Sequence, residues 1–240
     1  MPLLAAPAAA PAAVDPIEAL QDPHSDQGPA RRSPVPVAVA CDSAFQFQYP
    51  EAGELLAAHG LEVLPWRPTA DEPLPAGIRA VVLPGGYPEL WAAELGAAAR
   101  ARASLRQAAG LGLPLLAECG GLLLLGQQLA DAAGRWHPMA GVLPIAAARG
   151  ELSLGYREAR CSTSGLLTRA GERWLGHEFH RWQLQDHPSA ETVVAARAGL
   201  WQLEGWGCPP REEGWTAPNV HASWLHLHWA GCPEIPRRLA

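Results

Sequence analysis

The stretch Pro114-Leu-Leu-Ala-Glu-Cys-Gly-Gly-Leu-Leu-Leu-Leu-Gly126 joins a short apolar run to a polar turn and then to a second apolar run. Residues 114–117 are typical of a buried strand, and the leucines that follow are enough for one or two turns of helix. The pattern predicts a sharp strand–helix turn that carries Cys119, as in a nucleophile elbow. The alternative is that Cys119 is a small buried apolar side chain, the usual fate of a free cysteine.

Two features of this turn suit a reactive thiol. Gly120 and Gly121 permit close approach of the backbone, and their amide N–H groups can face a developing oxyanion. The start of a helix behind Cys119 favours the thiolate form of its side chain. The stretch alone leaves both interpretations of Cys119 open.

Strands and helices alternate on the N-terminal side of this stretch. The sequence predicts strands over residues 35–41, 61–66, 79–83 and 114–117. It predicts helices over residues 51–59, over 90–109 with a break near Gly96, and from behind Cys119 to about Ala130. Such alternation indicates a parallel sheet with helices on both faces.

A second glycine turn, Pro84-Gly85-Gly86-Tyr87-Pro88-Glu89, follows the third predicted strand. Ligands of open α/β sheets collect at the carboxyl ends of the strands. Because both glycine turns fall at such ends, the sequence predicts a site between them.

The pattern changes beyond Gly141, where short segments such as 154–158 and 193–196 predict antiparallel strands added to the core. Residues 223–229 predict a further strand. The folded domain is expected to cover residues 34–240, and the Ala- and Pro-rich residues 1–33 a flexible tail or linker.

The composition excludes several classes of function. A net charge of −6 argues against general nucleic-acid binding. All 18 basic residues are arginine, so the sequence holds neither a P-loop lysine nor a Schiff-base lysine. Five cysteines without a CxxC pair fit a reducing cytoplasm rather than a disulfide framework, and no apolar run reaches the ~18 residues of a membrane span.

Two histidine clusters, Gly176–His180 and His221–Trp229, could supply a base for Cys119. If residues 223–229 form one strand, His226 and His228 point the same way, so that one could contact the thiol while the other orients it. The alternative is that these histidines lie at the surface or are satisfied in the core. A zinc site is the rival use, but His177-x-x-His180 lacks the helical i, i+4 spacing of a metalloprotease, and no metal is predicted.

These motifs, taken in order, closely resemble the glutamine amidotransferase domain of cobyrinate a,c-diamide synthases, the corrin-amidating enzymes of cobalamin biosynthesis. The resemblance runs from about Val35 to Trp229. It rests on the following segments: residues 37–45, 49–51, 85–89 (GGYPE), 117–121 (AECGG), 154–158 (LGYRE), 176–180 (GHEFH) and 223–229 (SWLHLHW).

The resemblance implies a class I glutamine amidotransferase fold, a flavodoxin-like α/β sandwich with a mostly parallel central sheet and helices on both faces. It implies that Cys119 attacks the side-chain amide of L-glutamine to form a glutamyl thioester, with His226 as the base. Gly85, Gly86 and Gly120 would bind glutamine and the oxyanion. The supporting residues that we expect around this site are Glu118, Tyr87, His177, His180 and His228.

The family also implies a partner. Ammonia would pass to an ATP-dependent synthetase domain or subunit that amidates cobyrinate, and ATP and magnesium are expected only there. Complete synthases carry that domain ahead of this one, so we expect a separate chain or a longer protein to supply it. A homodimer is compatible with the sequence; neither nucleic acid nor a membrane is an expected partner.

The sequence departs from class I triads at one position, because His228 stands where a glutamate two residues after the histidine is common. We therefore expect a Cys–His dyad without an assigned third member. Two alternatives remain at this point: a related amidotransferase that acts on cobyric acid or a cell-wall lipid, and a non-catalytic docking remnant.

Overall fold

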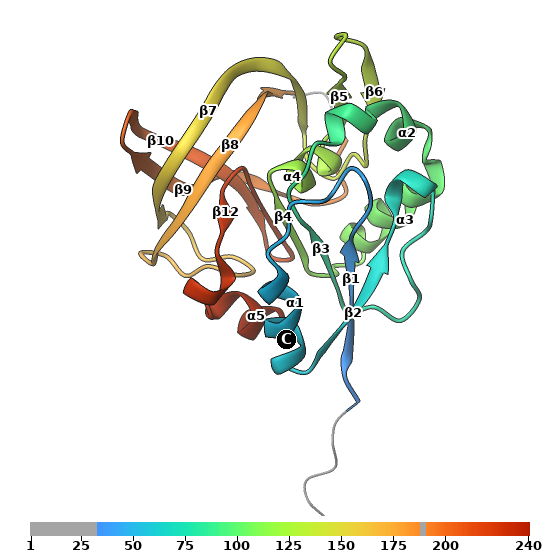
Figure 1. Ribbon diagram of the computed structural model, residues 1–240, viewed down its shortest axis with the longest axis horizontal. Coiled ribbons are helices and arrows are strands. Elements are labelled where there is room, and N and C mark those ends of the chain that lie inside the picture. Colours follow the sequence, from blue (N-terminus) through green and yellow to red (C-terminus); the bar gives the residue numbers. More distant parts are fainter. Residues whose placement is uncertain (1–32, 188–190) are drawn as a thin grey trace, which may run out of the picture. The chain divides into compact units, whose positions relative to one another are not determined.

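Five parallel strands form the centre of a mixed sheet in the computed structural model, which describes residues 33–187 and 191–240 (Figure 1). Their order across the sheet is β2-β1-β3-β4-β11, the 2-1-3-4-5 order of flavodoxin-like folds. The predicted parallel sheet is confirmed, with these bounds: β1 Val35–Ala40, β2 Leu61–Trp66, β3 Ala80–Leu83, β4 Leu115–Glu118 and β11 Val220–Ser223. The predicted tail, residues 1–33, lies outside the described residues except for Ser33.

Helices cover both faces of this sheet because side chains alternate along each strand. On one face, Val37 and Val39 pack with α1 (Pro50–Ala58) and α5 (Glu234–Leu239). On the other, Ala38 and Ala40 belong to a second core that contains leucines of α2 (Ala92–Ala97), α3 (Ala99–Gly110) and α4 (Gly120–Leu125). Within the described residues, three short 3₁₀ helices complete the helical segments: η1 Pro68–Ala70, η2 Pro88–Trp91 and η3 Trp229–Gly231. None of the helices described is long and apolar enough to cross a membrane.

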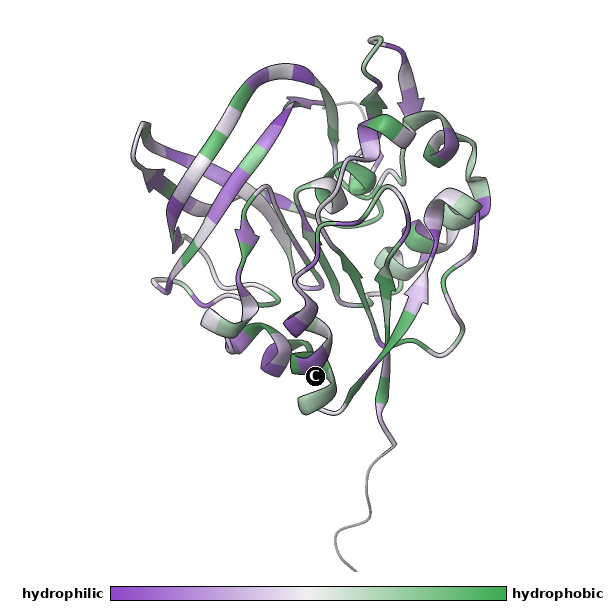
Figure 2. Ribbon diagram, viewed as in Figure 1, coloured by the Kyte–Doolittle hydropathy of each residue, from purple (hydrophilic) through white to green (hydrophobic). Residues whose placement is uncertain are grey.

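Antiparallel strands extend the sheet beyond β11, in the order β10-β9-β7-β8-β12. Their bounds are β7 Ile145–Cys161, β8 Arg173–Asp186, β9 Arg197–Gly205, β10 Cys208–Ala217 and β12 His226–Leu227. Because β12 follows β11 after two residues yet pairs with β8, this part of the sheet curls back on itself beside β4 (Figure 1). Figure 2 shows hydrophobic central strands, whereas β7 and β8 alternate between hydrophilic and hydrophobic residues.

Three local predictions were wrong. The helix after Cys119 ends at Leu125, since Gly126 is extended (ψ −178°) and lies against the carbonyl of Ile145, and Gln128–Ala130 form strand β5 instead. Strand β5 pairs with β6 (Trp136–Pro138) and β7. The break expected near Gly96 is confirmed, because α2 ends at Ala97 and α3 begins at Ala99.

The other two wrong predictions concern strands. Residues 193–196 are irregular, and strand β9 begins at Arg197. Residues 223–229 do not form one strand, because β11 ends at Ser223, β12 covers only His226–Leu227 and η3 begins at Trp229. The chain turns between β11 and β12, where the Ser223 hydroxyl oxygen accepts the Leu225 N–H at 2.9 Å.

Candidate active site

Cys119 occupies a strained turn between β4 and α4. Its backbone has φ 49° and ψ −106°, and among the residues described only Asp71 is another non-glycine with positive φ. Such conformations cost about 1–3 kcal/mol and persist where surrounding structure enforces them. Here the Cys119 N–H donates to the Ser223 carbonyl at 2.7 Å, which extends the β4–β11 pairing into the turn. The predicted strand–turn–helix elbow is present.

The two glycine turns touch each other. A Cβ on Gly120 would lie 2.9 Å from the Gly86 nitrogen, and a Cβ on Gly121 would overlap the Leu83 carbonyl. Only glycine allows this approach of the two backbones. The amides of Gly120 and Gly86 face the Cys119 thiol, the arrangement in which two N–H groups can stabilise an oxyanion.

Burial decides the protonation of the resting thiol. It raises the pKa of Cys119 to about 12, against the lowering effect of the Gly120 and Gly86 amides, while Glu89 and Glu118 raise the pKa further. The thiol therefore requires a base. Its Sγ also lies 3.9 Å from the Phe179 carbonyl oxygen of strand β8.

His226 lies in β12 directly opposite His177 of β8. The two imidazole rings stack with centroids 4.8 Å apart and planes 12° apart, and the Phe47 ring meets His226 edge-on at 4.7 Å. Burial lowers the pKa of His226 to about 3, with a further contribution from His177, so the ring is held neutral. Gly85 lies against the same ring, where a Cβ would overlap the imidazole.

Cys119 and His226 line one cavity of about 190 Å³, together with Gly86, His177 and Phe179. The structure thus brings together the predicted nucleophile, base and oxyanion glycines, although they come from three different parts of the chain. This arrangement can hold a small amide-bearing molecule between a thiol, two amide donors and a neutral imidazole.

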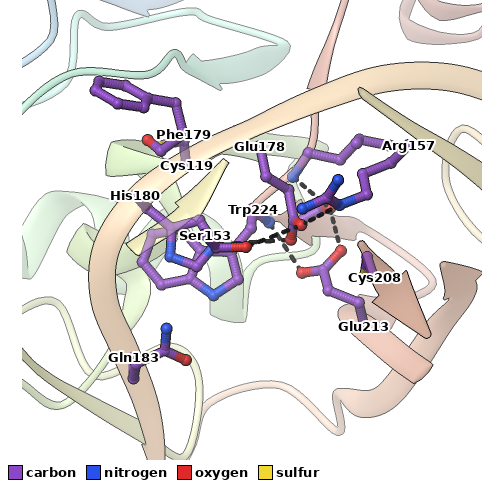
Figure 3. A network of polar contacts seen from close by, with 12 residues as sticks. Cys119, Ser153, Arg157, Glu178, Phe179, His180, Gln183, Cys208, Glu213 and Trp224 are labelled. Carbon is purple, nitrogen blue, oxygen red and sulfur yellow. Dashed lines mark hydrogen bonds and ion pairs between the residues drawn. The ribbon is translucent and has the colours of Figure 1, made fainter. Parts of the chain in front are cut away.

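Alternation along β8 sends His177 and Phe179 to one face and Glu178 and His180 to the other, as Figure 3 shows for residues 178–180. The buried Glu178 carboxylate accepts hydrogen bonds from Arg157 (2.7 Å), Arg211 and Ser153. Burial opposes ionisation of Glu178, but contacts with His180, Arg211 and Arg157 lower its pKa to about 2. This network braces the antiparallel strands behind the site.

His180 packs its ring on Trp224, with centroids 3.8 Å apart, and its Nδ1 lies 2.8 Å from the Trp182 carbonyl oxygen. Because a carbonyl oxygen only accepts, Nδ1 carries the proton. The structure thus places His180 beside the nucleophile's cavity but at the back of β8, apart from the His177–His226 pair.

The remaining predicted residues have separate surroundings. His228 Nε2 lies 2.6 Å from Glu51 Oε1, and the His228 side chain is 55% exposed. The Glu118 carboxylate is buried behind the nucleophile and accepts the Trp229 indole N–H at 3.2 Å. Burial raises the pKa of Glu118 to about 8 despite this bond. Tyr87 is half exposed at the mouth of the cavity.

A second cavity of about 200 Å³ adjoins the first and shares Cys119, Gly86 and Tyr87 with it. Its polar lining includes Glu89 and Arg181, two residues that the sequence did not assign. Glu89 is the last residue of the GGYPE motif, so the sequence did contain a signal that this residue lies near the site. Arg181 directly follows GHEFH, and nothing in its spacing indicated a role. Across residues 33–187 and 191–240, no three His, Cys, Asp or Glu side chains converge as metal ligands would.

The chain is similar to known proteins both in sequence and in fold. Residues 36–233 match the model of the CobB/CobQ-like glutamine amidotransferase domain. The chain is 42% identical to a cobyrinate a,c-diamide synthase of Synechococcus sp. over 206 residues, which are 85% of this chain and 43% of that protein. It is 43% identical to a hydrogenobyrinate a,c-diamide synthase of Streptomyces coelicolor over 218 residues, 90% of this chain and 41% of that protein. The chain therefore spans less than half the length of these relatives.

Solved structures share the fold at low sequence identity. The PurLQS complex from Thermotoga maritima contains a chain with TM-score 0.57 and 16% identity, covering 81% of this chain and 87% of that one. A structure described as a glutamine amidotransferase has TM-score 0.54 and 20% identity, covering 85% of this chain and 96% of that one. These similarities concern the fold alone.

Proposed function

The chain belongs to the family of CobB/CobQ-like glutamine amidotransferase domains, and on this premise we propose that it releases ammonia from L-glutamine with Cys119 as the nucleophile. One observation carries the proposal: the thiol on the strained turn faces two backbone amides and shares a cavity with a buried, neutral imidazole. These are the parts that acyl transfer from an amide requires.

In the proposed reaction, His226 takes the thiol proton as Sγ attacks the amide carbon of glutamine. The Gly86 and Gly120 amides stabilise the negative oxygen that forms. The protonated imidazole then returns the proton to the departing nitrogen, so that ammonia leaves and a glutamyl thioester remains on Cys119. Water, deprotonated by His226, hydrolyses the thioester to glutamate and restores the thiol.

Burial keeps the His226 ring neutral at rest, so its nitrogen is free to accept a proton. The buried thiol is protonated at rest. Proton transfer within the pair is therefore coupled to attack on the substrate, and the Cys–His pair operates without a third carboxylate on His226.

We also propose that a separate synthetase part consumes the ammonia. The relatives are named for diamide synthesis on corrins, and this chain spans 43% and 41% of two of them. An ATP-dependent synthetase part, with its own ATP and magnesium, would amidate cobyrinate-type carboxylates with the ammonia released here. The absence of lysine from this sequence supports placing the P-loop in that part. Such a biosynthetic reaction belongs in the cytoplasm, which fits five free cysteines.

The test is glutamine-dependent ammonia release by the wild type and by Cys119→Ala and His226→Ala. We expect Cys119→Ala to abolish release and His226→Ala to reduce kcat by about 100-fold or more. Cys41→Ala is the matched control, because Cys41 is an exposed free cysteine. Normal release by either site variant would refute the assignment.

A further inference from the structure

We propose that the Glu89 carboxylate binds the α-ammonium group of glutamine. This contact offsets the negative charge that disfavours the Cys119 thiolate. The inference rests on the proposed function, because it assigns a role to the charge next to the same nucleophile.

The position of Glu89 follows from the contact between the two glycine turns. Glu89 lies in η2, one residue beyond Pro88, and the Cδ of Pro88 would lie 2.9 Å from a Cβ on Gly120. Since Gly120 directly follows Cys119, this packing fixes the start of η2 against the elbow. Glu89 and Cys119 consequently line the same cavity of about 200 Å³.

The lining of that cavity matches an amino acid with an apolar stem. Glu89 provides a negative group and Arg181 a positive group, while Leu123, Phe179 and Trp182 supply apolar surface. A zwitterionic α-amino acid presents an ammonium and a carboxylate beside a chain of methylene groups. The ammonium complements Glu89, the carboxylate complements Arg181, and the side-chain amide can reach Cys119.

Several charged or titratable groups surround the thiol and its proposed base. They are Glu89 on η2, Glu118 on β4, His177, Glu178, His180 and Arg181 on β8, and His226 on β12. Glu118 has a pKa raised to about 8, so it is mostly neutral at pH 7. Glu178 is compensated by its two arginines. Burial also raises the pKa of Glu89, yet among the carboxylates Glu89 has the largest effect on the pKa of Cys119, after burial of the thiol and the opposing Gly120 amide.

A bound ammonium group changes this balance. It neutralises the field of Glu89 at Cys119, so the thiolate forms more readily once glutamine is in place. Without substrate, the same carboxylate adds to the effect of burial, which keeps the thiol protonated. The nucleophile is thus activated by the substrate that it attacks.

The experiment compares the wild type with Glu89→Gln and with Glu94→Gln, an exposed carboxylate on α2 that serves as the matched control. Alkylation of Cys119 by iodoacetamide is followed by peptide mass spectrometry at pH 8 without glutamine. Loss of the charge should accelerate alkylation of Glu89→Gln by about three- to tenfold, and Glu94→Gln should match the wild type. Equal alkylation rates for all three proteins would overturn the charge effect.

The second measurement is ammonia release from glutamine and from 4-carbamoylbutanoate, which lacks the α-amino group. Glu89→Gln should raise KM for glutamine about tenfold or more, while kcat changes less and the preference for glutamine over 4-carbamoylbutanoate collapses. An unchanged preference would overturn ammonium recognition. Failure of the proposed function would look different, since the wild type itself would then release no ammonia while the alkylation rates still report on Glu89.

Discussion

The imidazole of His226 stacks on that of His177, with ring centroids 4.8 Å apart and planes 12° apart. The two residues are direct partners across the β12–β8 pairing, so the backbone register holds the rings together. Phe47 closes the edge of His226, and Gly85 approaches its ring. The ring that we propose as the base is therefore positioned by packing.

This stack predicts distinct effects for two substitutions at His177. His177→Ala leaves one ring face unsupported and should lower kcat about tenfold, whereas His177→Phe restores a flat ring and should recover most of the loss. Burial is the larger cause of the low pKa of His226, and the His177 charge adds to it. Removal of that charge in His177→Phe raises the pKa of His226. Because the base must be neutral, the acid limb of the kcat profile should move to higher pH.

The measurement is ammonia release as a function of pH for both variants. Loss of activity in His177→Phe as deep as that in His177→Ala would contradict positioning by stacking. An acid limb that stays at the wild-type pH would contradict the charge effect.

The backbone of Cys119 predicts an unusual order of stability. With φ 49° and ψ −106°, the turn suits glycine better than any residue with a Cβ. We expect Cys119→Gly to have a free energy of unfolding about 1 kcal/mol or more above that of Cys119→Ala, although glycine elsewhere usually destabilises. Urea unfolding of the two variants measures this difference. A less stable Cys119→Gly would show that the turn is not strained.

Buried Glu118 predicts a pH-dependent loss of stability. Its pKa is raised from 4.5 to about 8 by burial, so the folded protein holds a proton that the unfolded chain releases between these values. The raised pKa therefore stabilises the fold fully below pH 4.5, and this contribution is lost as pH rises toward 8. Glu118→Gln keeps an acceptor for Trp229 and does not ionise. It should be more stable than the wild type by about 3 kcal/mol at pH 7, with a smaller difference at pH 4.5.

Chemical denaturation of both proteins between pH 4.5 and 8 provides the check. A constant difference across this range would mean that Glu118 is ionised in the folded protein as freely as in the unfolded chain.

The parallel half of the fold was accessible from the sequence because its signals are local. The apolar runs of β1 to β4 identify strands directly, and the Cys119 turn stands between one of these strands and a helix. The helix predicted after Cys119 was too long because the leucines and Gln127–Ala130 suit a helix or a strand equally. Pairing with β6 and β7 makes this segment strand β5. Tertiary hydrogen bonds thus outweighed local preference.

The candidate site was predictable only in part for a related reason. Cys119, Gly86 and His226 belong to motifs that occur near predicted strand ends. The His177–His226 stack depends on β12 leaving the line of β11 to pair with β8, and the chain turn at Ser223 that allows this has no periodic signature. Glu89 and Cys119 are 30 positions apart in the sequence, and their proximity likewise depends on contact between the two turns that carry them. Such contacts become visible only in three dimensions.

The most direct test of the central claim is covalent trapping of Cys119 by a diazoketone analogue of glutamine. We predict a single adduct on the peptide that contains Cys119, and its formation should be slowed by excess L-glutamine and absent in Cys119→Ala. This readout follows the first chemical step and is independent of any ATP-dependent partner. An adduct at another cysteine, or no protection by L-glutamine, would contradict the assignment of Cys119 as the nucleophile that attacks glutamine.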